Sequence, residues 1–584
     1  MIPRRSGRRM FSVIAFSLIA LMIRTPASAQ DVRPGVSRPP AAGTVRPTAA
    51  KHGMVVAQEK LAARIGADVL ARGGNAVDAA VATGFAMAVT YPRAGNIGGG
   101  GFMVIHLADR NRDIAIDYRE TAPRATTRDI FLGADGKPEP ARSRDSALGI
   151  GVPGTVAGLA LALDQYGSGQ FTLADLLGPA IALARDGFKI ADDTADTLPP
   201  SRRRLARWPS SMTIFSRPDG SPLREGDLLV QADLAATLTA IAERGSRGFY
   251  EGPVAERLVT AIRAAGGIMT LDDLKSYKPL IREPVRGSYR GYDIVSMPLS
   301  SSGGIVLIES LNILEGFPMR DLHQGSVDSL HLLIEAMKRA YADRARYLGD
   351  PAFVRAPIAT LLSKDYAARQ RASIDRARAT PAAAVPLPPP REGDNTTHFS
   401  VADAFGNAVS NTYTLNFSYG LGLVAEGTGV LLNNELDDFT AAPGASNAYG
   451  LVGFEANLPG PGKRPLSSMT PTIVLKDGKP VLVTGSPGGS RIVSTVLQVI
   501  VNALDYDMNI AAAVDAPRLH HQWLPDEVRA ERGFPEDIIT GLRARGHTVV
   551  MPMGQTSANS IAITPDGFFG AADPRTRGSR AAGY

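Results

Sequence analysis

The pattern of hydrophobic and polar positions divides the chain into a helix-rich part and a strand-rich part. Before about residue 375, helix-length hydrophobic stretches alternate with short strands. After residue 395, short β-forming stretches separated by tight turns predominate. Residues 378–394 (RATPAAAVPLPPPREGD) lie between the two parts, and their proline density is typical of an extended, exposed linker. We therefore expect an α+β protein with a linker between its two parts.

Glycines, prolines and the hydrophobic pattern predict several individual helices and strands. Residues 74–92 form a predicted helix that ends before a proline, and residues 151–167 form another between two glycines. Residues 326–350 and 491–506 also have helical patterns. The glycine-rich GNIGGGG leads into a predicted strand, FMVIHLAD, and YDIVSMP is a further short strand. No internal repeat of short period is present.

Two hairpins are predicted in the second part. One pairs THFSVAD with AVSNTYTLN across AFGN, and the other turns at Asp477-Gly478. If the first turn centres on Phe405, Thr396 lies opposite Thr414. Because side chains alternate along a strand, Thr396, Thr414 and Asn416 then share one sheet face. A register slip of one residue would move all three to the other face.

The first 29 residues have the composition of a secretory signal peptide. They combine a basic RRSGRR segment, the apolar run FSVIAFSLIALMI and the small-residue sequence ASA. The apolar run is shorter than the ~20 residues of a membrane span, so a retained anchor is the less favoured alternative. We expect an exported protein, periplasmic or secreted, without a stable membrane anchor. Residues 30–50 are rich in Pro, Ala and Gly and are expected to form a flexible tail.

Charge and cysteine content narrow the function classes. Removing the five leader arginines lowers the formal net charge from +6 to +1, which gives no support for a nucleic-acid partner. The chain has no cysteine, which excludes thiol catalysis, iron–sulfur clusters and cysteine-bound zinc.

The stretch NTTHFS, from Asn395 to Ser400, follows the linker and places hydroxyl groups beside an imidazole. A threonine hydroxyl needs a base, but His398 lies ~6–7 Å from Thr396 along a strand, beyond the ~2.6–3.2 Å of direct proton transfer. If the chain is cut before Thr396, the new α-amino group, with a reference pKa of about 7.7–8.0, sits on the same residue and can serve as general base. The alternative is an ordinary strand start made of β-forming residues.

The segment TGSPGGSR (residues 484–491) places Gly488 and Gly489 at a predicted strand-to-helix turn. Backbone N–H groups at the positive end of a helix can hold an oxyanion. A phosphate loop is the alternative, but no Gly-Lys-Ser/Thr follows.

These residues belong to a set of motifs that resembles the γ-glutamyltranspeptidase family. The resemblance runs from about Gly53 to the final AGY and rests on GNAVDAAVA, GNIGGGGFMV, DYRETAP, GVPGTVAG, DNTTHFSVADAFGNAVSNTYTLN, LLNNELDDF, KRPLSSMTPTIV, TGSPGGSR and HHQWLPDE. It implies an N-terminal-nucleophile hydrolase, an αββα sandwich of two stacked, mainly antiparallel sheets between helix layers. It also implies self-cleavage between Asn395 and Thr396 into a large subunit (51–395) and a small catalytic subunit (396–584) that remain one αββα unit.

The resemblance also assigns roles to single residues. Thr396 would be the nucleophile and, through its α-amine, the base; Thr414 would bond it, and Gly488 and Gly489 would stabilise the oxyanion. The residues expected to bind substrate are Arg119, Ser467 and Ser468 for the α-carboxylate, Asn416, Glu435 and Asp438 for the α-ammonium, and Tyr449 as a lid. Arginine forks onto carboxylates and paired acids neutralise an ammonium, so these residue types suit a γ-glutamyl head.

The implied substrates are glutathione and other γ-glutamyl compounds, with water, amino acids or dipeptides as acceptors. No cofactor and no metal are expected. Two other function classes are a related β-lactam side-chain acylase, expected to lack the clamp for an amino-acid head, and a non-catalytic exported binding protein, expected to lack Thr396 or the glycine loop.

The remaining motifs give weaker evidence for a functional site. Residues 149–154 match G-x-G-x-x-G but follow a polar segment instead of a strand, which argues against a dinucleotide site. Side chains of adjacent residues point in different directions. A structural role is therefore favoured over a metal site for His520 and His521. For the same reason, Asp437 and Asp438 are not expected to act together as the two carboxylates of a glycosidase. The alternative for Arg119 is a solvent-exposed ion pair with Asp117 or Glu120, without a role in substrate binding.

Overall fold

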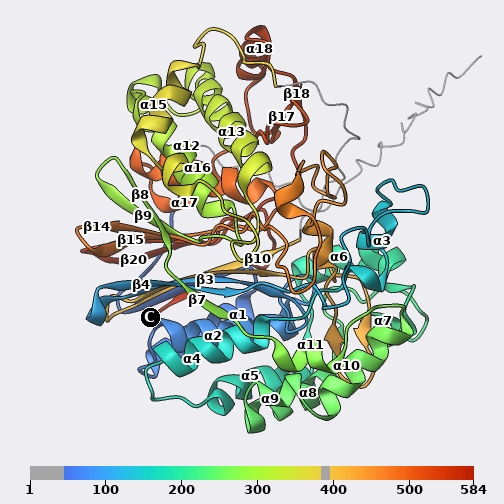
Figure 1. The fold of residues 1–584 in the computed structure, drawn as a ribbon. Helices are drawn as coiled ribbons and strands as arrows, with labels where there is room; N and C mark the ends of the chain where they lie inside the picture. The colour runs from blue at the N-terminus through green and yellow to red at the C-terminus, as the bar shows by residue number, and fades with distance from the viewer. Residues whose placement is uncertain (1–44, 383–394) are drawn as a thin grey trace, which may run out of the picture.

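Two seven-stranded sheets lie face to face, and helices cover the outer face of each (Figure 1). The computed structural model describes residues 45–382 and 395–584. Neighbouring strands within both sheets pair antiparallel. The predicted αββα sandwich of stacked antiparallel sheets is therefore confirmed.

The strand order of each sheet mixes segments from before and after the predicted cleavage point. The first sheet runs β21 (Arg580–Gly583), β2 (Gly53–Ala57), β10 (Thr397–Asp403), β11 (Ala408–Thr414), β3 (Gly100–Leu107), β4 (Arg112–Tyr118) and β7 (Leu280–Arg282). The second runs β1 (Thr48–Ala50), β20 (Gly567–Ala571), β19 (Ser560–Thr564), β15 (Lys479–Thr484), β14 (Thr472–Lys476), β9 (Tyr292–Ser296) and β8 (Val285–Tyr289). Neither part of the chain contributes a complete sheet, so each part needs the other to bury its strands.

Helices from distant parts of the sequence form the outer layers (Figure 1). The layer on the first sheet contains α1 (Lys60–Ala71), α2 (Ala76–Thr90) and α4 (Thr155–Tyr166), with α5 (Leu173–Asp186) and α8 (Ala232–Arg244) packed behind them. The layer on the second sheet contains α12 (Gly303–Glu315), α13 (Val327–Tyr347), α16 (Arg491–Leu504) and α17 (Ile510–Asp515).

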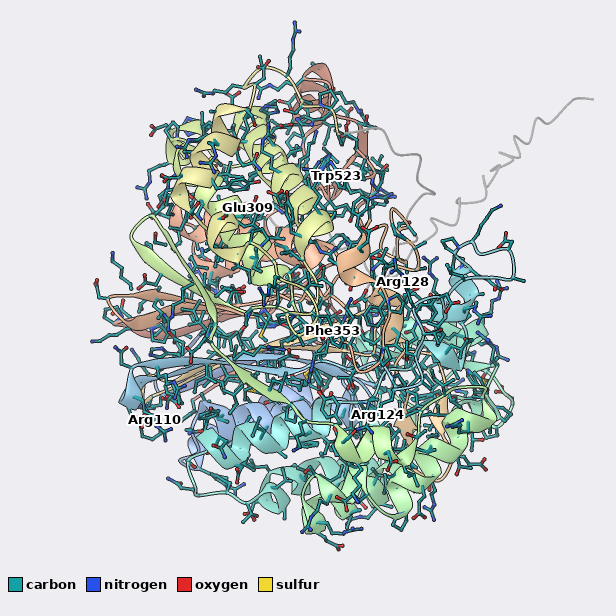
Figure 2. All side chains as sticks on the ribbon, in the orientation of Figure 1. Arg110, Arg124, Arg128, Glu309, Phe353 and Trp523 are labelled. Atoms are coloured by element: carbon teal, nitrogen blue, oxygen red, sulfur yellow. The ribbon has the colours of Figure 1, made fainter. Side chains whose placement is uncertain are left out.

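Alternation along β2 shows how the layers are held together. Met54 and Val56 pack into a hydrophobic cluster between the sheets, whereas Val55 and Ala57 pack into the cluster under the helices of the first sheet. Side chains fill the space between all the layers (Figure 2). Because both faces of these strands are buried, they read as continuous apolar runs and lack an alternating pattern.

Most predicted elements are present. The predicted helices correspond to α2, α4, α13 and α16, and the predicted strands around them to β3 and β9. The second hairpin turns at Asp477 and Gly478, both with positive φ, as a two-residue turn requires. Residues 149–154 follow a short 3-10 turn, and no strand leads into them, so the dinucleotide pattern lacks its context here as well.

The last residues of the predicted flexible tail are ordered instead: Thr48–Ala50 form β1, which pairs with β20 near the other end of the chain. Residues 1–44 and 383–394 lie outside the described residues, and with them the predicted leader and most of the linker. None of the helices within residues 45–382 and 395–584 has the length and hydropathy of a membrane span.

Candidate active site

The open end of the first hairpin carries the predicted nucleophile. In β10 and β11, Thr397 pairs with Tyr413 and His398 with Thr412, which is the register predicted from a turn at Phe405. Even-numbered side chains of both strands face the second sheet: Ser400 Oγ donates to the Asn559 carbonyl there. Thr396 and Thr414 continue this face, so strand alternation directs both hydroxyls toward the end of β15 and the turn that follows it.

Two threonine hydroxyls converge on one carbonyl. Thr396 Oγ1 and Thr414 Oγ1 each donate to the Asn395 carbonyl oxygen at 2.8 Å, and the two hydroxyl oxygens are 3.4 Å apart. Thr414 Oγ1 accepts in turn from the Asn416 N–H at 2.9 Å, and Ser418 Oγ donates to the Asn395 side chain. The peptide expected to be cut is therefore held at both its carbonyl and its side chain.

His398 has partners of its own. Its Nδ1 lies 2.8 Å from Thr412 Oγ1 and its Nε2 lies 3.0 Å from Ser400 Oγ. Burial lowers the pKa of His398 to about 3, so the imidazole is neutral at physiological pH. No hydrogen bond joins it to Thr396 among the described residues, in agreement with the prediction that it is not the base for this hydroxyl.

The glycine turn lies between β15 and α16. Gly488 has φ +127° and Gly489 has φ +58°, conformations that glycine adopts without strain. A Cβ on Gly489 would lie 2.4 Å from the Tyr449 ring. The two glycine N–H groups donate no hydrogen bond to other described residues and lie just before the N-terminus of α16, where an anion is favoured.

A cluster of buried charged side chains surrounds Arg119. The Arg119 guanidinium is fully buried, which rules out the surface-pair alternative. Its Nη1 donates to Glu435 Oε1, its Nη2 donates to Asp438 Oδ2 at 2.5 Å, and its Nε donates to the Pro465 carbonyl at 3.2 Å. Nη1 also lies 3.8 Å from Glu120 Oε2. One cation thus meets three carboxylates, which leaves the cluster with excess negative charge when all are ionised.

Burial and this imbalance shift the acids of the cluster. Burial raises the pKa of Glu435 above its usual range and that of Glu120 to about 8, although Arg119 opposes both shifts. Burial alone would lower the pKa of Arg119, but Glu435, Asp438 and Glu120 hold it above its usual range. A cation that entered the cavity beside Glu435 and Asp438 would favour the ionised forms of these acids.

Tyr449 and the serine pair complete the walls. Tyr449 OH donates to the Asn416 carbonyl and side-chain oxygens, both at 2.8 Å, and its ring lies beside Gly489. The Ser467 carbonyl accepts from Ser302 N at 2.9 Å and from Ser302 Oγ at 2.6 Å, which ties the serine loop to the start of α12.

These groups line one cavity, in which about 280 Å³ is free of protein atoms, open solvent included. Its lining residues are Arg119, Thr396, Thr414, Asn416, Glu435, Asp438, Tyr449, Leu451, Ser467, Ser468, Met469, Gly489 and Ile492. Of the site residues predicted from the sequence, all line the cavity except Gly488 and Asn395, each of which is adjacent in the chain to a lining residue. Sequence reasoning missed the apolar lining, although Leu451 and Met469 lie within two residues of predicted site residues.

The adjacent pairs Asp437-Asp438 and His520-His521 point in different directions, as predicted, and the two members of each pair have different partners. Asp437 turns away from the cavity to Ser143 Oγ at 2.5 Å, and burial raises the pKa of its carboxyl to about 6. His520 Nδ1 lies 2.9 Å from Ser494 Oγ, whereas His521 Nε2 lies 3.1 Å from Asp526.

One group in the described chain has metal-ligand geometry, formed by His331, Glu335 and His547. However, His331 and His547 hydrogen-bond each other at 2.8 Å, and the Glu335 carboxylate accepts from Arg339 at 2.6 Å. These potential ligands already have partners, and we assign them no metal.

Comparison with known proteins finds relatives over nearly the whole chain. The family described as "Gamma-glutamyltranspeptidase" matches residues 62–583. The glutathione hydrolase proenzyme of Escherichia coli (strain K12) is 50% identical over 562 residues, which cover 96% of each chain. The cephalosporin acylase of Bacillus halodurans has a similar structure, with a TM-score of 0.81 and 29% identity, over 94% of this chain and 99% of that one.

A solved chain of the Helicobacter pylori γ-glutamyltranspeptidase is 47% identical and has a TM-score of 0.54. It covers 55% of this chain, and 91% of its own length is matched. The family match extends over nearly all of the described fold and includes both sides of the cavity. The protein is a member of the γ-glutamyltranspeptidase family.

Proposed function

We propose that this enzyme is a γ-glutamyltransferase and hydrolase that takes the γ-glutamyl group from glutathione or related amides. The observation that carries the proposal is the cavity itself, in which the Thr396 hydroxyl lies beside a cluster able to bind a zwitterionic amino-acid head. A γ-glutamyl group ends in such a head, with one carboxylate and one ammonium on the same carbon. Binding that head would hold the γ-carbonyl against Thr396, which is catalysis by positioning.

The first step of the proposal is self-cleavage. Thr396 Oγ attacks the Asn395 carbonyl carbon, a C–O bond forms and the C–N bond breaks, and the proton lost by the hydroxyl is transferred to the released amine. The Thr414 hydroxyl, at 2.8 Å from the carbonyl oxygen, stabilises the developing negative charge. Water then hydrolyses the ester, which leaves a carboxylate on Asn395 and a free α-amine on Thr396.

The second step is acyl transfer. The free α-amine accepts the proton of the Thr396 hydroxyl as its oxygen attacks the γ-carbonyl carbon of the donor. The oxyanion is held by the N–H groups of Gly488 and Gly489, and the leaving amine takes the proton. A γ-glutamyl ester on Thr396 remains. Water converts it to glutamate, and the amine of an amino acid or dipeptide converts it to a new γ-glutamyl amide.

Substrate binding requires an exchange of ion pairs. In the free cavity, Arg119 is bonded to Glu435 and Asp438. We propose that the substrate ammonium takes over these carboxylates, together with Asn416, and that the N–H groups released on Arg119 turn to the α-carboxylate. Ser467 and Ser468 donate to the same carboxylate, and Tyr449 covers the bound head. The exchange keeps every buried charge paired, which avoids the cost of desolvating an isolated ion.

The two chains formed by cleavage are proposed to stay together as a heterodimer, because the β10–β11 hairpin of the small chain lies between β2 and β3 of the large chain in the middle of the first sheet. Separation would leave the edges of β2, β3 and the hairpin unpaired and exposed to water. The leader-like residues 1–29 support export, and we propose a periplasmic or secreted enzyme.

The alternative is an acylase, favoured by the similarity to a solved cephalosporin acylase. A direct test compares turnover of a γ-glutamyl anilide with that of a glutaryl anilide, which lacks only the α-ammonium. We expect the γ-glutamyl donor to be strongly preferred, and a dipeptide acceptor to raise its turnover. Equal or better turnover of the glutaryl anilide would overturn the proposed head recognition in favour of the acylase.

A further inference from the structure

A second buried arginine approaches the cavity from the helix layer of the second sheet. Arg344 lies on α13 and is 4% exposed. Its Nε donates to Ser302 Oγ at 3.0 Å, and its Nη2 donates to Ser468 Oγ at 3.4 Å. Ser468 is a lining residue of the cavity, so this guanidinium is separated from the cavity by one side chain.

Arg344 differs from Arg119 in its partners. Arg119 contacts three carboxylates, whereas Arg344 forms no ion pair with any carboxylate in the described part of the chain. Burial lowers the pKa of Arg344, and Tyr341 and Asp438 oppose the shift. A buried guanidinium paired only with hydroxyls is costly unless an anion completes its surroundings. The cavity behind Ser468 is where such an anion can bind.

Arg344 sets the direction of the Ser468 hydroxyl and supports the backbone of Ser467. Ser468 Oγ accepts from the guanidinium, so its own hydrogen is free to point into the cavity. Ser467 Oγ accepts from the Met469 N–H at 3.1 Å, which leaves its hydrogen free in the same way. Ser302, bonded by Arg344 Nε, donates to the Ser467 carbonyl at 2.6 Å. Arg344 thus reaches both members of the serine pair.

The same face of α13 reaches the glycine turn. Tyr341, one helical turn before Arg344, donates through its OH to the Ser490 carbonyl, directly after Gly489. A helix from the large part of the chain therefore supports two loops that come from the small part.

We propose that Arg344 is a positioning residue for the donor's α-carboxylate. It orients the Ser468 hydroxyl as a donor, holds the Ser467 backbone in place through Ser302, and supplies the positive charge that Arg119, already paired with Glu435 and Asp438, does not provide alone. The inference rests on the proposed function, because it takes the serine pair to be the carboxylate-binding wall. The ligand class is an α-amino acid with a free α-carboxylate.

The test uses Arg344→Met, which removes charge and donors at similar length, and Arg344→Lys, which keeps the charge. The matched control is Arg346→Met: Arg346 is on the same helix but exposed, over the ring of Trp523 (labelled in Figure 2) at 5.6 Å. Each protein is checked for cleavage into two chains. Inhibition constants are then measured for L-glutamate and for its α-carboxamide, alongside KM and kcat for a γ-glutamyl anilide.

For cleaved Arg344→Met we expect KM and the L-glutamate inhibition constant to rise together by about tenfold or more, as for loss of charge-assisted bonding. The carboxamide, which carries no α-carboxylate, should bind nearly as in wild type, and kcat should fall less than KM rises. Arg344→Lys should recover part of the loss, and Arg346→Met should match wild type. Equal weakening of both inhibitors, or no change for either, would overturn the role of Arg344.

Two results separate this inference from the proposed function. If wild-type enzyme binds L-glutamate and the carboxamide equally, the carboxylate-binding wall itself is wrong. If wild type discriminates and the variants discriminate just as well, only the inference about Arg344 fails. Where Arg344→Met remains uncut, Arg344→Lys and Ser302→Ala decide: both should reduce the discrimination, and an unchanged ratio in both overturns the inference.

Discussion

The two ends of the hairpin formed by β10 and β11 carry similar small polar residues and use them in opposite ways. At the closed end, Asp403 is an acceptor: it takes hydrogen bonds from the N–H groups of Ala76, Phe405 and Asn407 at 2.7, 2.9 and 2.9 Å. Each bond satisfies a backbone donor that the turn would otherwise leave unpaired. The closed end is a structural element that locks the turn onto the start of α2.

At the open end, the hydroxyls of Thr396 and Thr414 are donors, and both point at the carbonyl of Asn395. This carbonyl belongs to the peptide bond expected to break. The comparison teaches that residue type alone does not mark a reactive site. Reactivity follows from which group the polar side chains surround, and at the open end that group is an electrophilic carbon beside a hydroxyl. Each prediction below alters one end of the hairpin or a wall of the cavity that the open end faces.

Thr396→Ala should have the largest effect, because it removes the only atom proposed to attack in both steps. We expect a single uncut chain and no measurable γ-glutamyl transfer, seen on a denaturing gel and in an anilide assay. Thr397→Ala is the matched control: its hydroxyl has no partner in the described chain, and it faces the other side of the sheet. Cleavage of the Thr396→Ala protein before residue 396 would contradict the assignment.

Gly489→Ala should lower kcat by about 10²–10³, the range for losing one oxyanion donor. The added methyl would meet the Tyr449 ring and force the turn to move. Gly226→Ala controls for the positive φ alone, because Gly226 has φ +87° and open space around its Cβ position. Steady-state kinetics on cleaved protein measure the effect. A cleaved variant with wild-type kcat would show that the turn serves only the fold.

Arg119→Lys should raise KM for the γ-glutamyl donor by roughly tenfold, because lysine keeps the charge but loses the fork that meets two partners at once. Arg217→Lys is the control, since Arg217 makes a two-pronged pair with Asp227 away from the cavity. Donor titrations on both proteins give the comparison. An unchanged KM in a normally cleaved variant would remove Arg119 from substrate binding.

Asp403→Ala tests the closed end and should change stability more than catalysis. Three backbone donors lose their acceptor, and we expect the free energy of unfolding to fall by about 2 kcal/mol or more. Cleavage and kcat at moderate temperature should remain near wild type. Phe405→Ala, an exposed residue of the same turn, is the control. Thermal unfolding followed by circular dichroism measures the loss; a variant that is stable but uncut would mean that the two ends are coupled.

His398→Gln should have the smallest effect on rate. With its pKa lowered to about 3, His398 is neutral during turnover, so the acid limb of the pH–rate profile should not move. A cleaved, folded variant slowed by ~10²–10⁴ would instead identify a general base. Stability should respond: between pH 6.5 and about 3 the unfolded state binds a proton that the folded state excludes, so wild type loses stability as pH falls, and the variant should lose less.

The sequence alone predicted the hairpin well, because a turn centred on Phe405 and strict alternation determine which threonines share a face. Periodicity did not determine the order of strands in either sheet. Strands buried on both faces, such as β2, have no polar side to indicate their orientation, and β1 pairs with β20 across most of the chain length. The sandwich was predicted through family resemblance and not from hydrophobic pattern.

For the active site, too, the sequence predicted some features and not others. Through the family resemblance, short motifs predicted all of the cavity's polar lining, but they did not predict that Arg119 would be bonded to Glu435 and Asp438 before substrate binds. Nor did they indicate Arg344, which reads as one charged residue among several on a helix. Its importance depends on burial and on contacts with Ser302 and Ser468, which only the folded chain brings together.

The central claim is that Thr396 both cuts the chain and carries the acyl group. Mass spectrometry of wild-type enzyme, acid-quenched during turnover of a γ-glutamyl anilide, tests both parts in one sample. The account predicts a small chain of residues 396–584 and a fraction of it carrying one added glutamyl group, mapped to Thr396. An uncut chain, a small chain beginning elsewhere, or a glutamyl group on any other residue would contradict it.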